Sequence, residues 1–363
     1  DSGGYAVSTR ERFDGEALTA LFDPFNQSDA PGVVVAAAID GEVVLRRAFG
    51  MANTGLGVGL DVRTRLRIGS TTKHMTCLAA LLLQEANALD IDAPIRRYLP
   101  ELTGIAGEPS LRSLMFHTSG QRCALDISLL TNGLAAPQAG YMLDIQRRQT
   151  SVNFPAGERM MYCNGGYHLL SLAIERVSAQ SFASFLASEI FAPLGMNDTF
   201  CLSDDFQLQS HMAASHVKTG ERSYNRGIFP LREILGEGSV VSCVDDMLKW
   251  CAHLRGEKLV GSRATWEMMF SSPTFSSGLR SDYMMGLKRT QYRGCELVHH
   301  AGGVVGGTCQ MLCVPEHGVD VVLLSNGAVS APTTLSLRIL DVLLADEMKG
   351  DPAPRPARMV PAL

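Results

Sequence analysis

The stretch RIGSTTKHMTCLAALLLQE, residues 67–85, holds the pattern from which the rest of the chain is best interpreted. Ser70 and Lys73 stand three residues apart in it, directly before the apolar run from Met75 to Leu83. That run is long enough for a buried helix near 71–86, and residues three apart lie on one face of a helix. The spacing therefore predicts that the Lys73 amine reaches the Ser70 hydroxyl.

Such a pair can make a nucleophile, although the pattern itself is not specific. A serine hydroxyl becomes nucleophilic when a neighbouring base takes its proton, and burial beside polar groups can lower the pKa of a lysine amine enough for that role. The N-terminal end of a helix would also stabilise an oxyanion. The same spacing recurs at Ser215 and Lys218, but a turn follows there instead of an apolar helix. The alternative for Ser70 and Lys73 is a helix start and a solvated charge.

A second candidate group, Tyr162 and Asn164, stands just before the helix that we expect over 165–179. A phenol at such a junction can relay protons, and the neighbouring amide can bind a substrate carbonyl. The alternative is a core tyrosine whose hydroxyl is satisfied, with the asparagine as a helix N-cap.

A third candidate group lies in LVHHAGGVVGG, residues 297–307. His300 could stabilise a tyrosinate or bind a substrate group, and Gly302 and Gly303 would let a substrate backbone lie against a strand edge. The alternative is a glycine-rich hairpin with solvent-facing imidazoles. His117, beside Thr118 and Ser119, is expected to tie down a loop.

The secondary-structure pattern places strands at both ends of the chain. Residues 33–50 are interpreted as two strands joined at the turn signal Asp40-Gly41. Further strand-like runs are 282–291, 295–301, 308–314 and 319–326. Helices are expected at 10–25, 71–86, 165–179, 181–191, 242–254 and 333–348, with Ser242 and Asp245 as a capping box for the fifth. These runs predict an α/β fold of the α+β type, in which N- and C-terminal helices flank an antiparallel sheet and a mostly helical region is inserted.

Composition narrows the class of protein. The net charge of −5 and the sparse lysines argue against a nucleic-acid partner, and no apolar run reaches the length of a membrane span. The nine cysteines, mostly in apolar surroundings, indicate buried reduced thiols and a cytoplasmic location, or a periplasmic one if a signal peptide was removed. Spacings typical of zinc ligands are absent, so we expect neither a metal nor another cofactor.

The order of the three candidate groups resembles that of the serine β-lactamase and penicillin-binding-protein superfamily. The segments LRSLMFHTSG, FPAGERMMYCNGGYHLLSLAIERVS, FAPLGMNDTF and SVVSCVDDMLKW are also similar to family signatures. The resemblance spans roughly residues 30–345. It falls on the branch with class C β-lactamases, D-aminopeptidases and D-amino-acid amidases, and D-aminopeptidases are the most similar.

The resemblance implies a role for each candidate residue. Ser70 would be the acylated nucleophile, with Lys73 helping to activate it and Tyr162 moving protons. Asn164 would orient the substrate, and His300 would stand where other members carry a lysine. The remaining implied substrate-binding residues are Gly302 and Gly303, the latter pairing its N–H with that of Ser70 as an oxyanion hole.

The resemblance also implies a substrate and a domain organisation. The expected activity is D-stereospecific aminopeptidase or amidase action on a peptide or small molecule; an esterase, DD-peptidase or β-lactamase, and a non-catalytic peptide-binding homologue, are the alternatives. Residues 1–350 would form one catalytic unit, with a sheet part of about 1–70 plus 240–350 and a helical part of about 71–239. Residues 351–363 are interpreted as a proline-rich tail or linker. The expected protein partners are further copies of the same chain, in a homo-oligomer, or additional C-terminal domains.

Overall fold

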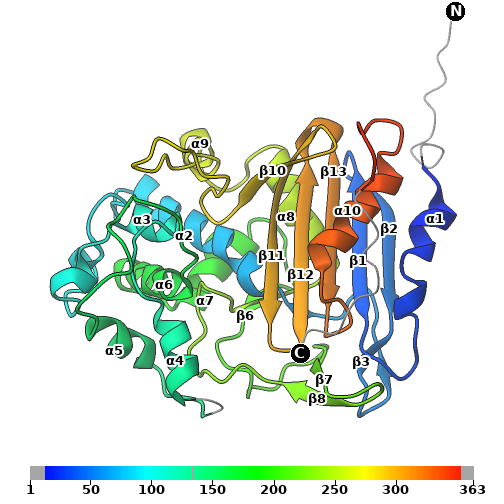
Figure 1. The fold of residues 1–363 in the computed structure, drawn as a ribbon, viewed down its shortest axis with the longest axis horizontal. Helices are drawn as coiled ribbons and strands as arrows, with labels where there is room; N and C mark the ends of the chain where they lie inside the picture. The colour runs from blue at the N-terminus through cyan, green and yellow to red at the C-terminus, as the bar shows by residue number, and fades with distance from the viewer. Residues whose placement is uncertain (1–12, 133–134, 353–363) are drawn as a thin grey trace, which may run out of the picture.

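The computed structural model describes residues 13–132 and 135–352. A six-stranded antiparallel sheet with the order β10-β11-β12-β13-β1-β2 occupies one side of the molecule (Figure 1). Its strands are β1 (Val33–Ile39), β2 (Glu42–Phe49), β10 (Lys288–Tyr292), β11 (Cys295–Val304), β12 (Gly307–Val314) and β13 (Val319–Ser325). Strands from the two ends of the chain meet where β1 pairs with β13. The expected sheet is confirmed.

Side chains on the central strands alternate between two apolar layers. On β1, Val34 and Ala36 join the larger core, whereas Val33, Val35 and Ala37 join the smaller one. Because successive side chains on a strand point to opposite faces, a strand covered on both faces must be apolar throughout. This explains the unbroken run VVVAAAI, all of which is buried.

Helices cover both faces of the sheet (Figure 1). Helix α10 (Pro332–Leu343) packs on β12 and β13, with α1 (Gly15–Ala20) beside it. Helix α8 (Val244–Arg255) packs on the opposite face against β1, β12 and β13. The remaining helices are α2 (Lys73–Glu85), α3 (Leu111–Met115), α4 (Ala124–Asn132), α5 (Tyr141–Arg147), α6 (Asn164–Ser178), α7 (Phe182–Leu186) and α9 (Arg263–Met269). Helices α2 to α7 form the helical region beside the sheet, as expected.

Short strands connect the sheet to the helical region. They are β3 (Met51–Asn53), β4 (Val58–Gly59), β5 (Leu66–Arg67), β6 (Phe200–Cys201), β7 (Ser215–Lys218), β8 (Tyr224–Gly227) and β9 (Val240–Ser242). Strand β5 pairs with β9, and a 3₁₀ turn, η3 (Gly69–Thr72), then leads directly into α2. This turn packs against β11. The fold thereby brings residues around 70 next to residues around 303.

Two local predictions need correction. The expected helix 10–25 is shorter: α1 ends at Ala20 and a separate 3₁₀ turn follows at Asp23–Phe25, where Pro24 lacks the N–H that a continuous helix needs; residues 10–12 lie outside the described residues. The capping box at Ser242 is wrong. Ser242 is the last residue of β9, so its hydroxyl bonds to Thr199 Oγ1 at 2.7 Å instead of capping α8.

Two further predictions concern the hairpin turn at Asp40-Gly41 and the proline-rich tail. Asp40 and Gly41 have φ values of +51° and +86°, as the turn signal between β1 and β2 predicts. The proline-rich stretch is described only at residues 351–352, and 353–363 lies outside the described residues.

Candidate active site

Lys73 is the first residue of α2 and is completely buried. Its Nζ lies 3.1 Å from Ser70 Oγ, 2.8 Å from Asn164 Oδ1 and 2.7 Å from the backbone oxygen of Glu237. Three acceptors match the three N–H bonds of a protonated amine. The structure therefore brings Ser70, Lys73 and Asn164 together, at the start of α2 and the start of α6.

Tyr162 lies beside this group through its ring. The Lys73 amine is 4.8 Å from the centroid of the Tyr162 ring, a cation–π distance, and the Tyr162 side chain is partly exposed. Among the described residues its hydroxyl has no hydrogen-bond partner, so the phenol reaches neither Ser70 nor Lys73 directly in this state. The tyrosine is thus placed at the site, with its oxygen free to meet a ligand.

His300 lies in a chain of buried hydrogen bonds behind Tyr162. Cys163 N–H donates to His117 Nδ1 at 3.0 Å, so Nε2 of His117 carries the proton and donates to Tyr283 at 3.2 Å. At the other end, His300 Nδ1 donates to the Ala301 oxygen at 2.5 Å, so His300 Nε2 accepts from the Tyr283 hydroxyl. The hydrogen bonds therefore all run the same way, from His117 through Tyr283 to His300.

Burial keeps both imidazoles of this chain neutral. Burial, with the positive charge of Lys73, holds the pKa values of His117 and His300 well below the usual range. The expectation that His117 ties down a loop is confirmed by its bond to Cys163, next to Tyr162. His300 is 3% exposed and is not a solvent-facing imidazole.

The glycines after His300 make a close backbone contact. A Cβ built on Gly302 would lie 1.8 Å from the Ile68 oxygen, and one built on Gly69 would lie 2.9 Å from Gly303 N. Gly302 is therefore needed for the approach of β11 to η3, whatever it does for a ligand. A Cβ on Gly303 would meet nothing within 4 Å, so that side of the strand is open.

The open side leads into a small cavity at Ser70. The cavity has a volume of about 70 Å³, and Ser70, Asn164 and Gly303 line it. Its apolar wall consists of Leu125, Phe229, Ile234 and Val304. A hydroxyl, an amide and a backbone edge thus surround a space with one apolar side.

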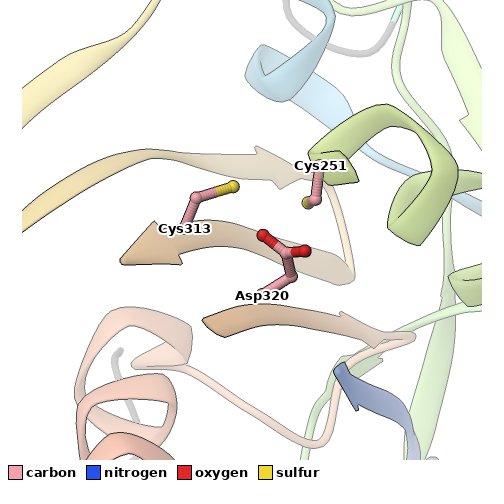
Figure 2. A group of neighbouring side chains, drawn as sticks. All are labelled: Cys251, Cys313 and Asp320. Atoms are coloured by element: carbon pink, nitrogen blue, oxygen red, sulfur yellow. The ribbon is translucent and has the colours of Figure 1, made fainter. Parts of the chain in front are cut away.

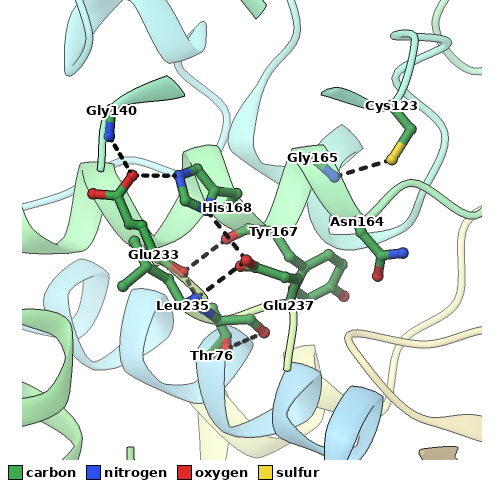
Figure 3. Close-up of polar contacts among 12 residues, drawn as sticks. Thr76, Cys123, Gly140, Asn164, Gly165, Tyr167, His168, Glu233, Leu235 and Glu237 are labelled. Atoms are coloured by element: carbon green, nitrogen blue, oxygen red, sulfur yellow. Dashed lines mark hydrogen bonds and ion pairs between the residues drawn. The ribbon is translucent and has the colours of Figure 1, made fainter. Parts of the chain in front are cut away.

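Glu237 is the residue of this site that the sequence did not reveal. Glu237 is 4% exposed, and its Oε1 lies 3.2 Å from His168 Nδ1 (Figure 3). A signal did exist on α6. Asn164, His168 and Ser171 are polar residues spaced four and three apart, hence on one helix face, and that face holds the loop that carries Glu237.

The two aspartates in the first turn of α8 differ in exposure. Asp246 is 2% exposed, because its Oδ2 accepts from Asp198 N–H at 2.7 Å and from Thr199 Oγ1 at 2.9 Å. Asp245 lies near the surface, paired with Arg46. Neither belongs to the candidate site.

The second serine–lysine pair lies elsewhere. Ser215 and Lys218 are on β7, and residues three apart on a strand point to opposite faces of the sheet. His216 between them is bonded to Asn326.

One buried group offers metal-ligand atoms. Cys251, Cys313 and Asp320 have their ligand atoms within 4.8 Å of one another (Figure 2). The Arg255 guanidinium already occupies the Asp320 carboxylate, at 2.9 and 3.3 Å, and burial raises the pKa of the Cys251 thiol. A cation would have to displace an arginine and two thiol protons, so the chemistry of these donors favours a structural role.

The sequence predicted buried reduced thiols and no membrane-spanning segment. All nine cysteines are free thiols, and seven of them are buried. Within the described residues, no helix combines the length and the apolar character needed to cross a bilayer.

The fold and this arrangement agree with a family comparison. A family profile described as Beta-lactamase matches residues 18–346, and the chain therefore belongs to the β-lactamase family. The resemblance inferred from the sequence is confirmed.

Individual relatives refine this assignment. D-aminopeptidase from Brucella canis is 28% identical over 336 residues, which are 90% of this chain and 61% of that protein. The chain thus spans less than two thirds of that relative's length. A penicillin-binding-protein homologue from Pyrococcus abyssi, described as octameric, superposes with a TM-score of 0.79 at 25% identity, covering 92% of this chain and 79% of that one. D-amino acid amidase from Ochrobactrum anthropi SV3, complexed with D-phenylalanine, shares the fold with a TM-score of 0.75 at 22% identity, covering 92% and 99%.

Proposed function

We propose that the protein is a D-stereospecific aminopeptidase or amidase that works through an acyl-enzyme on Ser70. The observation that carries the proposal is the buried Lys73 amine, 3.1 Å from the Ser70 hydroxyl at the mouth of the apolar-walled cavity. The preference for D-residues rests on the relatives, since D-aminopeptidases match most of this chain.

Acylation begins with attack of Ser70 Oγ on the substrate carbonyl carbon. Lys73 first gives one of its three protons to solvent, and the neutral amine then takes the Ser70 hydroxyl proton. Tyr162 relays this proton by donating its own to the leaving amine as it accepts one from Lys73. The backbone N–H groups of Ser70 and Gly303 hold the oxyanion, and Asn164 orients the substrate amide. Collapse breaks the C–N bond, and the leaving amine takes the proton.

Deacylation repeats these steps with water as the nucleophile. Water attacks the acyl carbon, its proton passes to the same Lys73 and Tyr162 pair, and the acid is released as Ser70 regains its proton. Tyr162 is suited to this role because its hydroxyl is uncommitted and its ring lies against Lys73. The hydrogen bond between Tyr283 and His300 holds β11 in place, and the edge of this strand faces the substrate.

The cavity suggests the size of the acyl side chain. At about 70 Å³, walled by Leu125, Phe229, Ile234 and Val304, it suits a small apolar side chain such as that of alanine. A bulky aromatic side chain would require this wall to move.

The test is a comparison of kcat/KM for D-alaninamide, L-alaninamide, a p-nitrophenyl ester and a chromogenic cephalosporin. The proposal predicts preference for the D-amide over its enantiomer, and loss of that activity in Ser70→Ala. The matched control is Ser215→Ala, which removes the serine of the other serine–lysine pair. Faster turnover of the ester or cephalosporin than of D-amides would assign the enzyme to an esterase or β-lactamase instead.

We also propose that the chain acts within a larger assembly, either as a homo-oligomer or with additional domains. The octameric archaeal homologue supports the first, and the greater length of the Brucella enzyme supports the second. Light scattering on the full natural protein tests the oligomer directly; a monomeric mass at micromolar concentration would argue against it.

A further inference from the structure

Beneath Lys73 lies a buried group of charged side chains that the proposed mechanism does not use. We call Glu233, His168 and Glu237 the His168 cluster (Figure 3). His168 Nδ1 lies 3.2 Å from Glu237 Oε1, and His168 Nε2 lies 3.4 Å from Glu233 Oε2. The His168 and Glu237 side chains are 1% and 4% exposed. Burying an ion pair this deeply costs free energy, because both charges lose their contact with water. A role in the site would explain why the pair is present.

The charges of this cluster follow from its geometry. Burial alone would lower the pKa of His168, but the neighbouring carboxylates of Glu237 and Glu233 outweigh it and raise the pKa to about 10. Burial also opposes ionisation of Glu233, yet the ion pair with His168 and the hydrogen bond from Gly140 N–H lower its pKa. One cation between two carboxylates leaves the cluster with a single negative charge.

The cluster is connected to Lys73 through Glu237. The Glu237 backbone oxygen accepts from Lys73 Nζ at 2.7 Å, so its carboxylate lies within one side-chain length of the amine. Its Oε1 accepts from Leu235 N–H at 3.1 Å, whereas its Oε2 is buried without a hydrogen-bond partner among the described residues. An incompletely satisfied carboxylate acts on a nearby ammonium over several ångströms, because little water screens it.

Other groups that face Lys73 carry no full charge of their own in this state. The segment of Lys73 itself contributes Ser70, His74 and Cys77. Helix α6 and the loop before it contribute Tyr162, Asn164 and Tyr167. The loop after α3 contributes His117, and strand β11 contributes His300. The imidazoles among them are kept neutral by burial. Arg67 lines the same cavity as Ser70 and Glu237, but its charge is paired with Asp205. The His168 cluster is the ionised group that is joined to Lys73 through Glu237.

We propose that His168 is a positioning residue whose positive charge, held against Glu237, sets how readily Lys73 releases its proton. This inference rests on the proposed acyl-enzyme function. With His168 charged, the Glu237 carboxylate is largely neutralised and Lys73 can become the amine that Ser70 requires. Without that charge, Glu237 holds the Lys73 ammonium more tightly. The same ion pair also fixes the loop whose carbonyl accepts from Lys73.

The test is the pH dependence of the reaction of Ser70 with a fluorophosphonate, in which Ser70 Oγ bonds to phosphorus and fluoride leaves, measured from single-turnover rates. In His168→Gln, the acidic limb of the profile should move to higher pH by roughly one unit, the size expected for one extra charge several ångströms away. In the double variant His168→Gln with Glu237→Gln, which restores a single negative charge, the limb should return toward the wild-type position. An unchanged limb in His168→Gln, or a further shift in the double variant, overturns the inference.

Ser171→Ala provides the matched control. Ser171 Oγ accepts from Gly236 N–H at 2.8 Å, so this variant loosens the same loop without changing any charge. It should lower the rate while leaving the pH limb in place. If it moves the limb as His168→Gln does, loop position explains the effect and the charge does not.

A measurement on the unaltered protein covers the case in which His168→Gln does not fold. With ¹⁵N-labelled histidine, NMR should show one imidazole with both ring nitrogens protonated from pH 7 to about pH 9. If every histidine were neutral at pH 8, the inference would fail. Wild-type protein in which the fluorophosphonate does not modify Ser70 would refute the proposed function instead, so the two failures are distinguishable.

Discussion

The hydroxyl of Tyr283 lies 3.2 Å from His300 Nε2 and joins the two walls of the candidate site. The same hydroxyl accepts from His117 at 3.2 Å, and His117 in turn holds Cys163, the residue after Tyr162. One buried phenol thus links the loop of the proposed proton-relay tyrosine to the strand of the proposed oxyanion hole. Backbone groups fix the two tautomers: Cys163 N–H that of His117, and the Ala301 oxygen that of His300.

Replacing Tyr283 with phenylalanine removes only this link. We expect kcat to fall about tenfold, the equivalent of one buried hydrogen bond, with KM nearly unchanged, because substrate contacts remain. Steady-state kinetics on the best amide substrate would measure this. Tyr98→Phe is the control, since Tyr98 accepts from Asp90 N–H away from the site. Equal effects in both variants would mean that Tyr283 acts through general stability alone.

The two adjacent glycines of β11 should respond differently to alanine. In Gly302→Ala the new methyl would meet the Ile68 backbone oxygen, which cannot move without displacing η3, so we expect a loss of about 3 kcal/mol or more in unfolding free energy. In Gly303→Ala the methyl enters open space, and stability should change by less than about 0.5 kcal/mol. Urea denaturation of both variants tests the contrast; similar losses would contradict the close contact described for Gly302.

Enlarging the cavity should change substrate choice. Ile234→Ala removes part of the apolar wall, so the ratio of kcat/KM for D-phenylalaninamide to that for D-alaninamide should rise by roughly tenfold. Ile105→Ala, which truncates a side chain that is 37% exposed, is the matched control. A ratio that stays constant in Ile234→Ala would mean that the acyl side chain binds elsewhere.

His74 should make the fold sensitive to acid. Burial lowers the pKa of His74 to about 3, against 6.5 when unfolded, so below pH 6.5 the unfolded chain takes up a proton that the folded chain refuses. Stability is therefore lost as pH falls below 6.5, by up to about 1.4 kcal/mol per pH unit from this group. His74→Leu should flatten the decline in unfolding free energy between pH 6 and pH 4. An equally steep decline in the variant would assign the acid sensitivity to other groups.

Spacing and periodicity were sufficient for the features that depend on neighbours in the sequence. Ser70 and Lys73 share a helix start, the strand at 33–39 is an unbroken apolar run, and the strand at 319–325 is apolar except for Asp320 and Ser325, so all three could be predicted. The order of the motifs then identified the family. The hairpin turn at Asp40-Gly41 was predictable for the same reason, because only local backbone geometry is involved.

Features that depend on distant contacts were missed. Glu237 stands between two glycines, as a surface loop residue would, and only its pairing with His168 in the fold explains its burial. Tyr283 lies in a strand-like run, where nothing indicates that its hydroxyl meets two histidines. The glycine at 302 suggested a substrate edge, whereas its closest neighbour is the Ile68 backbone.

Ser70 is proposed as the covalent nucleophile, and mass spectrometry of the intact and digested protein after incubation with a fluorophosphonate is the decisive measurement. We expect a single phosphonyl adduct, located on the peptide that contains Ser70, absent in Ser70→Ala and retained in Ser215→Ala. An unmodified wild-type protein, or an adduct on any other residue, would contradict it.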